Sequence, residues 1–290
     1  MDASTPRQVA VIGCGLMGSG IAEHSARRGL DVVVVETDPG AVERGRARVL
    51  HSLDTAEARG KIAAEERDGA ERRLTFTDDW SSIGECDLVI EAVSEDPMLK
   101  VDVFGRIDKL AADDALLTSN TSSIPIMKLA TATQRPEKVI GLHFFNPVPV
   151  LPLVELVPSL LTSPGTIDAA TTFAGDTLGK HVIRSQDRAG FVVNALLIPY
   201  LLSAIRMLES GFATLEDIDQ GMMRGCAHPM GPLALTDLIG LDTTMAVAES
   251  MYAEFKEPLY APPPLLSRMV EAGLLGRKAQ RGFYDYSSKG

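Results

Sequence analysis

The chain has 290 residues, of which 45% are hydrophobic and 23% charged, and its net charge is −11. This composition is that of a soluble globular protein, and the acidic balance argues against nucleic-acid binding, which requires a basic face. The longest apolar stretch, 191–205, contains Asn194 and Pro199 and is shorter than the ~20 residues of a membrane span. Three widely spaced cysteines without metal-ligand spacing, and an N-terminus without a signal pattern, predict a cytoplasmic protein with reduced thiols and no metal.

Short β-branched runs alternate with helical patterns along the first two-thirds of the chain. We expect strands at 8–12, 32–35, 88–90, 116–118 and 139–140. We expect helices at 16–28, 40–59, 63–73 and 99–110. Strands separated by helices predict right-handed βαβ units and a parallel sheet.

The pattern changes after residue 141. Closely spaced prolines mark a turn, and further elements follow as strands at 153–157 and 181–184 and a helix at 166–178. Beyond 189 only helices are predicted, at 191–210, 215–223, 232–250 and 265–272. The predicted fold class is therefore α/β: a parallel-sheet α/β domain over 1–185, then an all-helical domain over 186–290.

A glycine-rich turn follows the first strand and opens the first helix. It reads Gly13-Cys-Gly15-Leu16-Met17-Gly18, in which the first glycine permits the tight turn and the second lets the backbone approach a pyrophosphate. The third glycine allows the helix to pack closely on the strand, and the helix N-terminus favours phosphate. The five residues Gly13, Gly15, Leu16, Met17 and Gly18 are predicted to bind a dinucleotide cofactor.

An acidic residue ends the second strand, where a dinucleotide ribose would lie. Glu36 stands 18 residues after Gly18, and its carboxylate can accept hydrogen bonds from the ribose hydroxyls. The carboxylate would repel a 2′-phosphate, and Thr37 follows it in place of a basic residue. NAD is therefore favoured, although one carboxylate does not by itself rule out NADP. The alternative is a solvated acid at a strand end.

Oxidation of an alcohol needs a base for the hydroxyl proton, and histidine is the usual one. Of the five histidines, His24 and His51 are expected on helix surfaces, His181 is expected to be structural, and His228 lies in a turn between helices. His143 differs because it ends a strand, and ligands gather at the carboxyl ends of strands in a doubly wound sheet.

A partner for His143 is predicted by strand register. If 139–145 and 151–157 pair antiparallel about a turn centred on Pro149, His143 faces Glu155, because each lies six residues from that proline. A carboxylate in an apolar strand is costly unless it is paired, so Glu155 would hold the imidazole in one tautomer. A purely structural His–Glu pair at a sheet edge is the alternative.

Two further polar features lie in apolar surroundings. The segment Ser119-Asn-Thr-Ser-Ser123 follows a strand, and either caps the next helix or presents hydroxyls to a ligand. Asn194 interrupts the apolar face of the first C-terminal helix, either as a locally bonded buried amide or as a ligand contact.

These motifs together resemble one family, the L-3-hydroxyacyl-CoA dehydrogenases, and within it the short single-function 3-hydroxybutyryl-CoA dehydrogenases. The resemblance covers nearly the whole chain. It rests on the segments 11–18, 90–93, 119–123, 141–149, 187–194, 228–232, 240–244 and 282–286, of which S-N-T-S-S and H-F-F-N-P-V are the most specific.

The resemblance implies roles for matching positions. His143 matches the catalytic base, Glu155 its orienting acid, and Ser122 and Asn194 the residues that hydrogen-bond the substrate. The positions that match cofactor contacts are Glu95, Lys100, Asn120, Asn146 and Lys278.

The family fold is a Rossmann-like domain followed by a helical domain that dimerises, so the resemblance implies a homodimer through helices 191–205 and 232–250. Members often carry several lysines where coenzyme A phosphates bind. Here the corresponding stretch has only Arg59 and Lys61, with Arg48 earlier, so the coenzyme A contacts are the least specified.

The predicted reaction is reversible NAD-dependent oxidation of an (S)-3-hydroxyacyl-CoA to the 3-oxoacyl-CoA, with 3-hydroxybutyryl-CoA and acetoacetyl-CoA as the expected pair. One alternative is a dehydrogenase of the same fold that acts on a free hydroxy acid. Another is a non-catalytic NAD-binding protein that retains the fold. The presence of all the acid–base and polar positions argues against the second alternative.

Overall fold

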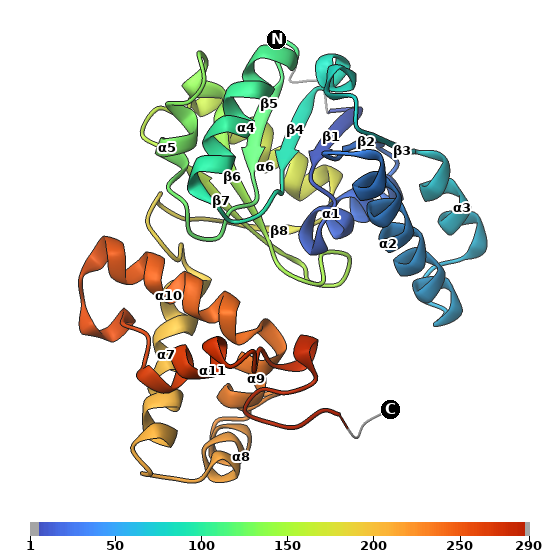
Figure 1. Cartoon of the computed structure of the whole chain (residues 1–290). Coiled ribbons are helices and arrows are strands. Elements are labelled where there is room, and N and C mark those ends of the chain that lie inside the picture. The colour runs from blue at the N-terminus through green and yellow to red at the C-terminus, as the bar shows by residue number, and fades with distance from the viewer. Residues whose placement is uncertain (1–5, 288–290) are drawn as a thin grey trace. The chain divides into compact units, whose positions relative to one another are not determined.

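The computed structural model describes residues 6–287 (Figure 1). The chain divides into two compact units, of which the first ends at Arg188 and the second begins at Ala189. None of the helices in the described range combines the length and the apolar character needed to cross a membrane.

The first unit is built on an eight-stranded sheet in the order β3-β2-β1-β4-β5-β6-β7-β8. Its strands are β1 (Gln8–Ile12), β2 (Asp31–Val35), β3 (Leu74–Thr77), β4 (Leu88–Glu91), β5 (Leu116–Ser119), β6 (Val139–Phe144), β7 (Leu153–Pro158) and β8 (His181–Arg184). Neighbouring strands are parallel except β6 and β7, which are antiparallel. The chain order reverses between β1 and β4, the place where ligands bind in doubly wound sheets.

Helices cover both faces of this sheet, which is why its central strands are continuous apolar runs. They are α1 (Leu16–Arg27), α2 (Pro39–Ala58), α3 (Ala64–Arg72), α4 (Pro97–Leu110), α5 (Ile126–Ala130) and α6 (Pro164–Thr172). Figure 1 shows α4 on the near side of the sheet and α6 behind it. Buried residues of α1 and of the α6 region, such as Ile21 and Phe173, share one core cluster with Val9, Val11 and Val34.

Two short elements of this unit were not predicted. The strand β3 has four partly buried or exposed residues at the sheet edge, so it shows no apolar run. The helix α5 has five residues and begins after Pro125. Its first N–H groups, those of Ile126 and Met127, donate to the Asp187 carboxylate at 2.7 Å each. That cap comes from 60 residues away, and no local sequence signal contains it.

His24 was expected on a helix surface, and this prediction is wrong. Its side chain lies in α1 with only 7% of its surface exposed. The Nε2 atom lies 2.9 Å from the Leu178 carbonyl oxygen, the geometry of an N–H donor to that oxygen. A polar residue on the inner face of a helix is stable when such a partner is supplied, and here the partner comes from the loop after α6.

The second unit is all-helical, with its own apolar core. Its helices are α7 (Val193–Glu209), α8 (Leu215–Gly225), α9 (Pro232–Ile239), α10 (Leu241–Phe255) and α11 (Pro264–Glu271). The single helix predicted over 232–250 is in fact two, α9 and α10. Gly240 separates them with a φ of +103°, a conformation that glycine adopts readily and that breaks the helical path.

Two buried carboxylates tie the C-terminal segment to this unit. Asp237 accepts hydrogen bonds from the backbone N–H groups of Phe283 and Tyr284 at 2.8 and 2.9 Å and from the Tyr286 hydroxyl at 3.0 Å. Asp219 accepts from the Tyr284 hydroxyl at 2.9 Å. Burial raises the pKa of Asp237 despite these bonds, with the Asp219 charge adding to the rise.

Candidate active site

The turn between β1 and α1 has the geometry of a phosphate-binding loop. Gly13 has a φ of +91°, and a Cβ on Gly18 would lie 1.8 Å from the Gly13 carbonyl oxygen, so only glycine fits there. Gly15 caps α1, and a Cβ on it would meet no atom within 4 Å. The loop therefore turns an open face and the N–H groups of the first helical turn outward, which suits a pyrophosphate.

Glu36 lies at the carboxyl end of β2, beside this loop. One carboxylate oxygen accepts from the Cys14 N–H at 2.5 Å, and the other accepts from the Thr37 N–H at 3.2 Å. The Arg48 guanidinium, from α2, donates to the Cys14 carbonyl. The acid and the glycine turn are thus one hydrogen-bonded unit, with the carboxylate placed where a ribose would lie.

A cleft of about 590 Å³ joins these features. Its lining includes the glycine turn and Glu36 on one side, Arg44 and Arg48 from α2, and residues of α4 on the other side. No basic residue directly follows Glu36 in the sequence, but the fold brings these two arginines into the same cleft. A large cleft with an open helix N-terminus and a carboxylate at the β2 end fits a dinucleotide.

Buried polar groups gather where β4 and β5 end. Lys100, from the first turn of α4, is 1% exposed, and its ammonium lies 2.6 Å from a carboxylate oxygen of Glu91 and 3.3 Å from one of Glu95. The Ser119 hydroxyl donates to the other Glu91 oxygen at 2.6 Å. This buried network, formed by Glu91, Lys100 and Ser119, connects two strand ends to the start of α4.

Glu95 holds the predicted substrate loop in place. One of its oxygens accepts from the Thr121 hydroxyl at 2.5 Å, from the Ser122 N–H at 2.9 Å and from the Ser123 hydroxyl at 3.0 Å. Burial acts to raise the pKa of Glu95, but the Lys100 charge and these hydrogen bonds outweigh it and lower the pKa below its usual value. Glu95 is therefore ionised at neutral pH and organises the loop that carries Ser122.

Asn120 links the end of β5 to the end of β6. Its side-chain oxygen accepts from the Phe144 N–H at 2.9 Å. The loop that carries Ser122 is thereby held against the strand that carries His143. Asn146 lies two residues beyond β6, exposed at the bend that leads to β7.

The predicted pairing of His143 with Glu155 is confirmed. The antiparallel register of β6 and β7 places the two residues opposite each other, and Nδ1 lies 2.8 Å from a Glu155 oxygen. Glu155 is 0% exposed and the histidine side chain 8%. Glu155 therefore accepts a hydrogen bond from the Nδ1–H group, which leaves Nε2 as the basic nitrogen of the neutral ring. The ring also contacts Phe145, with 4.7 Å between centroids.

Two of the remaining predicted residues belong to the first unit and two to the second. Arg59 and Lys61 are exposed just beyond α2, in the first unit. In the second unit, Asn194 is the second residue of α7 and partly exposed, and the Lys278 ammonium lies 2.6 Å from an Asp242 carboxylate oxygen.

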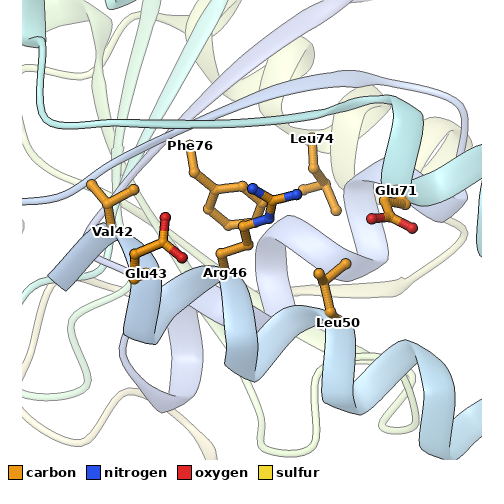
Figure 2. Close-up of a pocket in the computed structure, with 7 residues that line it drawn as sticks. All are labelled: Val42, Glu43, Arg46, Leu50, Glu71, Leu74 and Phe76. Carbon is orange, nitrogen blue, oxygen red and sulfur yellow. The ribbon is translucent and has the colours of Figure 1, made fainter. Parts of the chain in front are cut away.

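A smaller hollow of about 170 Å³ lies between α2 and β3. Figure 2 shows Val42, Arg46 and Leu50 along one face of α2, with Leu74 and Phe76 of β3 across from them. None of the predicted site residues lines this hollow. Within residues 6–287, no group of His, Cys, Asp and Glu is arranged to hold a metal ion.

Sequence reasoning missed Glu91 as a site residue, although the signal was available. Glu91 ends the apolar strand Leu88–Glu91 just as Glu155 lies within an apolar strand, and both are 0% exposed. The cost of burying a carboxylate predicts a cationic or hydrogen-bonding partner for each. For Glu91 the partner is Lys100, nine residues ahead in the chain.

Comparisons with family models, with relatives and with solved structures agree on one family. The NAD-binding domain of 3-hydroxyacyl-CoA dehydrogenase matches residues 8–188, and the C-terminal domain of the same family matches residues 190–286. A 3-hydroxybutyryl-CoA dehydrogenase of Mycobacterium tuberculosis is 57% identical over 281 residues, which cover 97% of this chain and 98% of the relative.

Two solved structures resemble the whole chain. A crystal structure of M. tuberculosis FadB2 has a TM-score of 0.97 at 56% identity, covering 98% of this chain and 100% of that one. The crystal structure of (S)-3-hydroxybutyryl-CoA dehydrogenase PaaH1 from Ralstonia eutropha has a TM-score of 0.92 at 44% identity, with the same coverage. The motifs, the two folded units and the full-length relatives agree, and the chain belongs to the 3-hydroxyacyl-CoA dehydrogenase family.

Proposed function

We propose that this protein is an NAD-dependent 3-hydroxybutyryl-CoA dehydrogenase that interconverts (S)-3-hydroxybutyryl-CoA and acetoacetyl-CoA. The full-length likeness to 3-hydroxybutyryl-CoA dehydrogenases supports the substrate. The observation that carries the chemistry is the His143–Glu155 pair, with 2.8 Å between Nδ1 and the carboxylate, on the sheet that also carries the dinucleotide cleft.

His143 is the proposed general base. Its Nε2 accepts the proton of the substrate 3-hydroxyl, and the ring becomes an imidazolium that the buried Glu155 carboxylate stabilises. Bound NAD supplies the acceptor for the hydride that leaves C3. In the reverse direction the imidazolium returns its proton to the oxygen of the reduced carbonyl.

Ser122 and Asn194 are the proposed substrate-positioning residues. The Ser122 backbone is fixed by Glu95, so its hydroxyl is presented from an ordered loop. Correct orientation of the reacting C3 hydrogen contributes to rate because it removes the entropy cost of alignment in the transition state. The assignment of Asn194 rests on its place at the end of the motif 187–194.

Further contacts with the cofactor and with coenzyme A are proposed from the places of charged and polar residues in the sequence and the fold. Glu36 favours NAD over NADP, because the 2′-phosphate of NADP would lie against the Glu36 carboxylate and be repelled by it. Lys278 and Asn146 are proposed cofactor contacts on motif grounds. Arg59 and Lys61, both exposed beyond α2, are proposed to contact the coenzyme A phosphates.

We also propose a homodimer and a reducing compartment such as the cytoplasm. Exposed apolar side chains on the helices of the second unit, among them Leu196, Leu238 and Tyr252, support a dimer contact. Cys14 and Cys86 are free and buried, and burial raises the pKa of each thiol to about 12, which is consistent with thiols that stay protonated and reduced.

The test is the rate of NADH and NADPH oxidation with acetoacetyl-CoA, followed by absorbance. We expect fast turnover with NADH and much slower turnover with NADPH. Equal or faster turnover with NADPH would contradict the role of Glu36 and leave the reaction intact. Turnover of free 3-oxo acids but of no acyl-CoA would contradict the proposal that the substrate is an acyl-CoA. NADH binding without turnover of any substrate would indicate a non-catalytic protein.

A further inference from the structure

The cofactor cleft has one wall that the phosphate and ribose contacts do not use. The glycine turn accounts for the pyrophosphate and Glu36 for the adenosine ribose. The cleft also extends along α4 and the 3-10 helix η1 (Trp80–Glu85), where its lining includes Trp80, Val103 and Arg106. Because adenine is attached to the ribose that Glu36 would bind, this wall lies next to the place where the base must go.

Arg106 and Trp80 form a stacked pair on this wall. The guanidinium carbon of Arg106 lies 3.9 Å from the centroid of the Trp80 ring. Trp80 is 8% exposed, whereas Arg106 is exposed. The guanidinium therefore lies over the indole ring, and both residues line the cleft, so the planar group is available to a ligand there.

Both partners are held by their own elements. The Asp79 carboxylate accepts from the Ser81 N–H at 2.9 Å and so caps η1 directly before Trp80. On α4, Phe104 and Ile107 are buried, which fixes the rotation of the helix that presents Arg106. A preformed flat cation is a good platform for a nucleobase, because planar π systems stack on guanidinium groups with little loss of side-chain freedom.

We propose that the adenine base of the cofactor stacks on the Arg106 guanidinium, with the Trp80 ring behind it, so that this pair selects the adenine end of the dinucleotide. The inference rests on the NAD binding in the proposed function. It adds an adenine-recognition site to the contacts that the motifs predict, since neither residue lies in any of those motifs.

Trp80 is the only tryptophan of the chain, so its fluorescence reports on this wall alone. We expect AMP and ADP-ribose, which carry adenine, to change the emission in a saturable way. Nicotinamide mononucleotide, which lacks adenine, should leave the emission unchanged. Because AMP does not absorb the emitted light, a change with AMP indicates contact near the indole. An equal response to nicotinamide mononucleotide, or no response to AMP, would overturn the proposal.

Variants of Arg106 separate stacking from charge. Arg106→Ala should raise the Kd for AMP, and the Kd for NADH, by about 5- to 100-fold, the usual effect of losing one base-stacking partner. Arg106→Lys keeps the charge without the plane and should lose nearly as much. The matched control is Arg184→Ala, at an exposed arginine on β8 at the far edge of the sheet, which should bind AMP as the wild type does.

Calorimetric titration of all three variants gives the decisive comparison. Unchanged AMP and NADH affinity in Arg106→Ala would overturn the adenine site and leave the proposed function intact. Full retention of affinity in Arg106→Lys would also overturn it, because charge alone would then suffice. No NADH binding by the wild type would overturn the proposed function together with this inference.

Discussion

Single buried carboxylates carry much of what the sequence reveals about this site. Glu155 lies within an apolar strand, and the cost of burying it required a partner, which the antiparallel register then identified as His143. The same cost applies to Glu91, whose partner Lys100 lies in a helix on the same unit. Strand register could not predict Lys100 as the partner of Glu91, because Lys100 lies on a helix and its position depends on how α4 packs on the sheet.

His24 predicts how stability changes with pH. The pKa of His24 is lowered to about 4, mainly by burial and further by the charges of Lys180, Arg28 and Arg27, while the hydrogen bond to Leu178 acts in the opposite direction. The unfolded chain, with an ordinary pKa of 6.5, then binds the proton first as the pH falls. The free energy of unfolding is therefore fully retained above that value and falls as pH drops toward 4, by up to about 3 kcal/mol.

The variant His24→Gln keeps a side-chain donor for the Leu178 carbonyl and removes the titration. Urea unfolding at several pH values should show a shallower acid loss of stability in this variant than in the wild type. His51→Gln, at an exposed histidine on α2, should keep the wild-type pH dependence. Identical pH profiles for His24→Gln and the wild type would contradict the account.

At the scale of elements, the buried network of Glu91, Lys100 and Ser119 anchors the start of α4 to the ends of β4 and β5. Lys100→Met should lower the free energy of unfolding by about 3–5 kcal/mol, because it leaves the fully buried Glu91 carboxylate without its cation. The measurement is chemical denaturation. Lys109→Met, at an exposed lysine of the same helix, is the control and should have little effect.

A double variant checks the cause of that loss. Glu91→Gln combined with Lys100→Met removes both charges, so it should lose less stability than Lys100→Met alone. Additive losses in the double variant would show that the two groups do not act as a pair. Lys100→Met alone should also raise the pKa of Glu95, because the Lys100 charge is one of the causes that lower that pKa.

Elements were predictable where the pattern was long and local. The strand 32–35 and the helix 40–59 were found because four valines in a row and a long stretch rich in Arg and Glu need no tertiary context. The edge strand β3 was missed because it is half-exposed. The break at Gly240 was missed because an isolated glycine is tolerated within helices, and only its φ of +103° shows that this one separates two of them.

At the scale of the whole molecule, the two folded units and the family were predictable because motifs occur along nearly the entire chain. The positions of Arg48, Trp80 and Arg106 in the cofactor cleft were not, because each is brought there by a fold contact between distant segments. Residues that act through local motifs were identified, whereas residues that act through packing required the structure.

The proposed dimer is a prediction at this scale. Sedimentation equilibrium should give twice the 31.1 kDa mass of one chain. Leu196→Glu, which places a charge on an exposed apolar position of α7, should shift the protein toward the monomer. Leu160→Glu is the matched control, because Leu160 is exposed in the first unit and should leave the mass unchanged. A monomeric wild type would contradict the proposal.

The central claim is that His143, oriented by Glu155, is the base of a hydroxyacyl-CoA dehydrogenase. The most direct test is kcat for His143→Gln with acetoacetyl-CoA and NADH, with the NADH Kd measured in parallel. The account predicts an unchanged NADH Kd and a kcat about 10²- to 10⁴-fold lower, the usual effect of losing a general acid–base. Near-normal turnover by His143→Gln would contradict it.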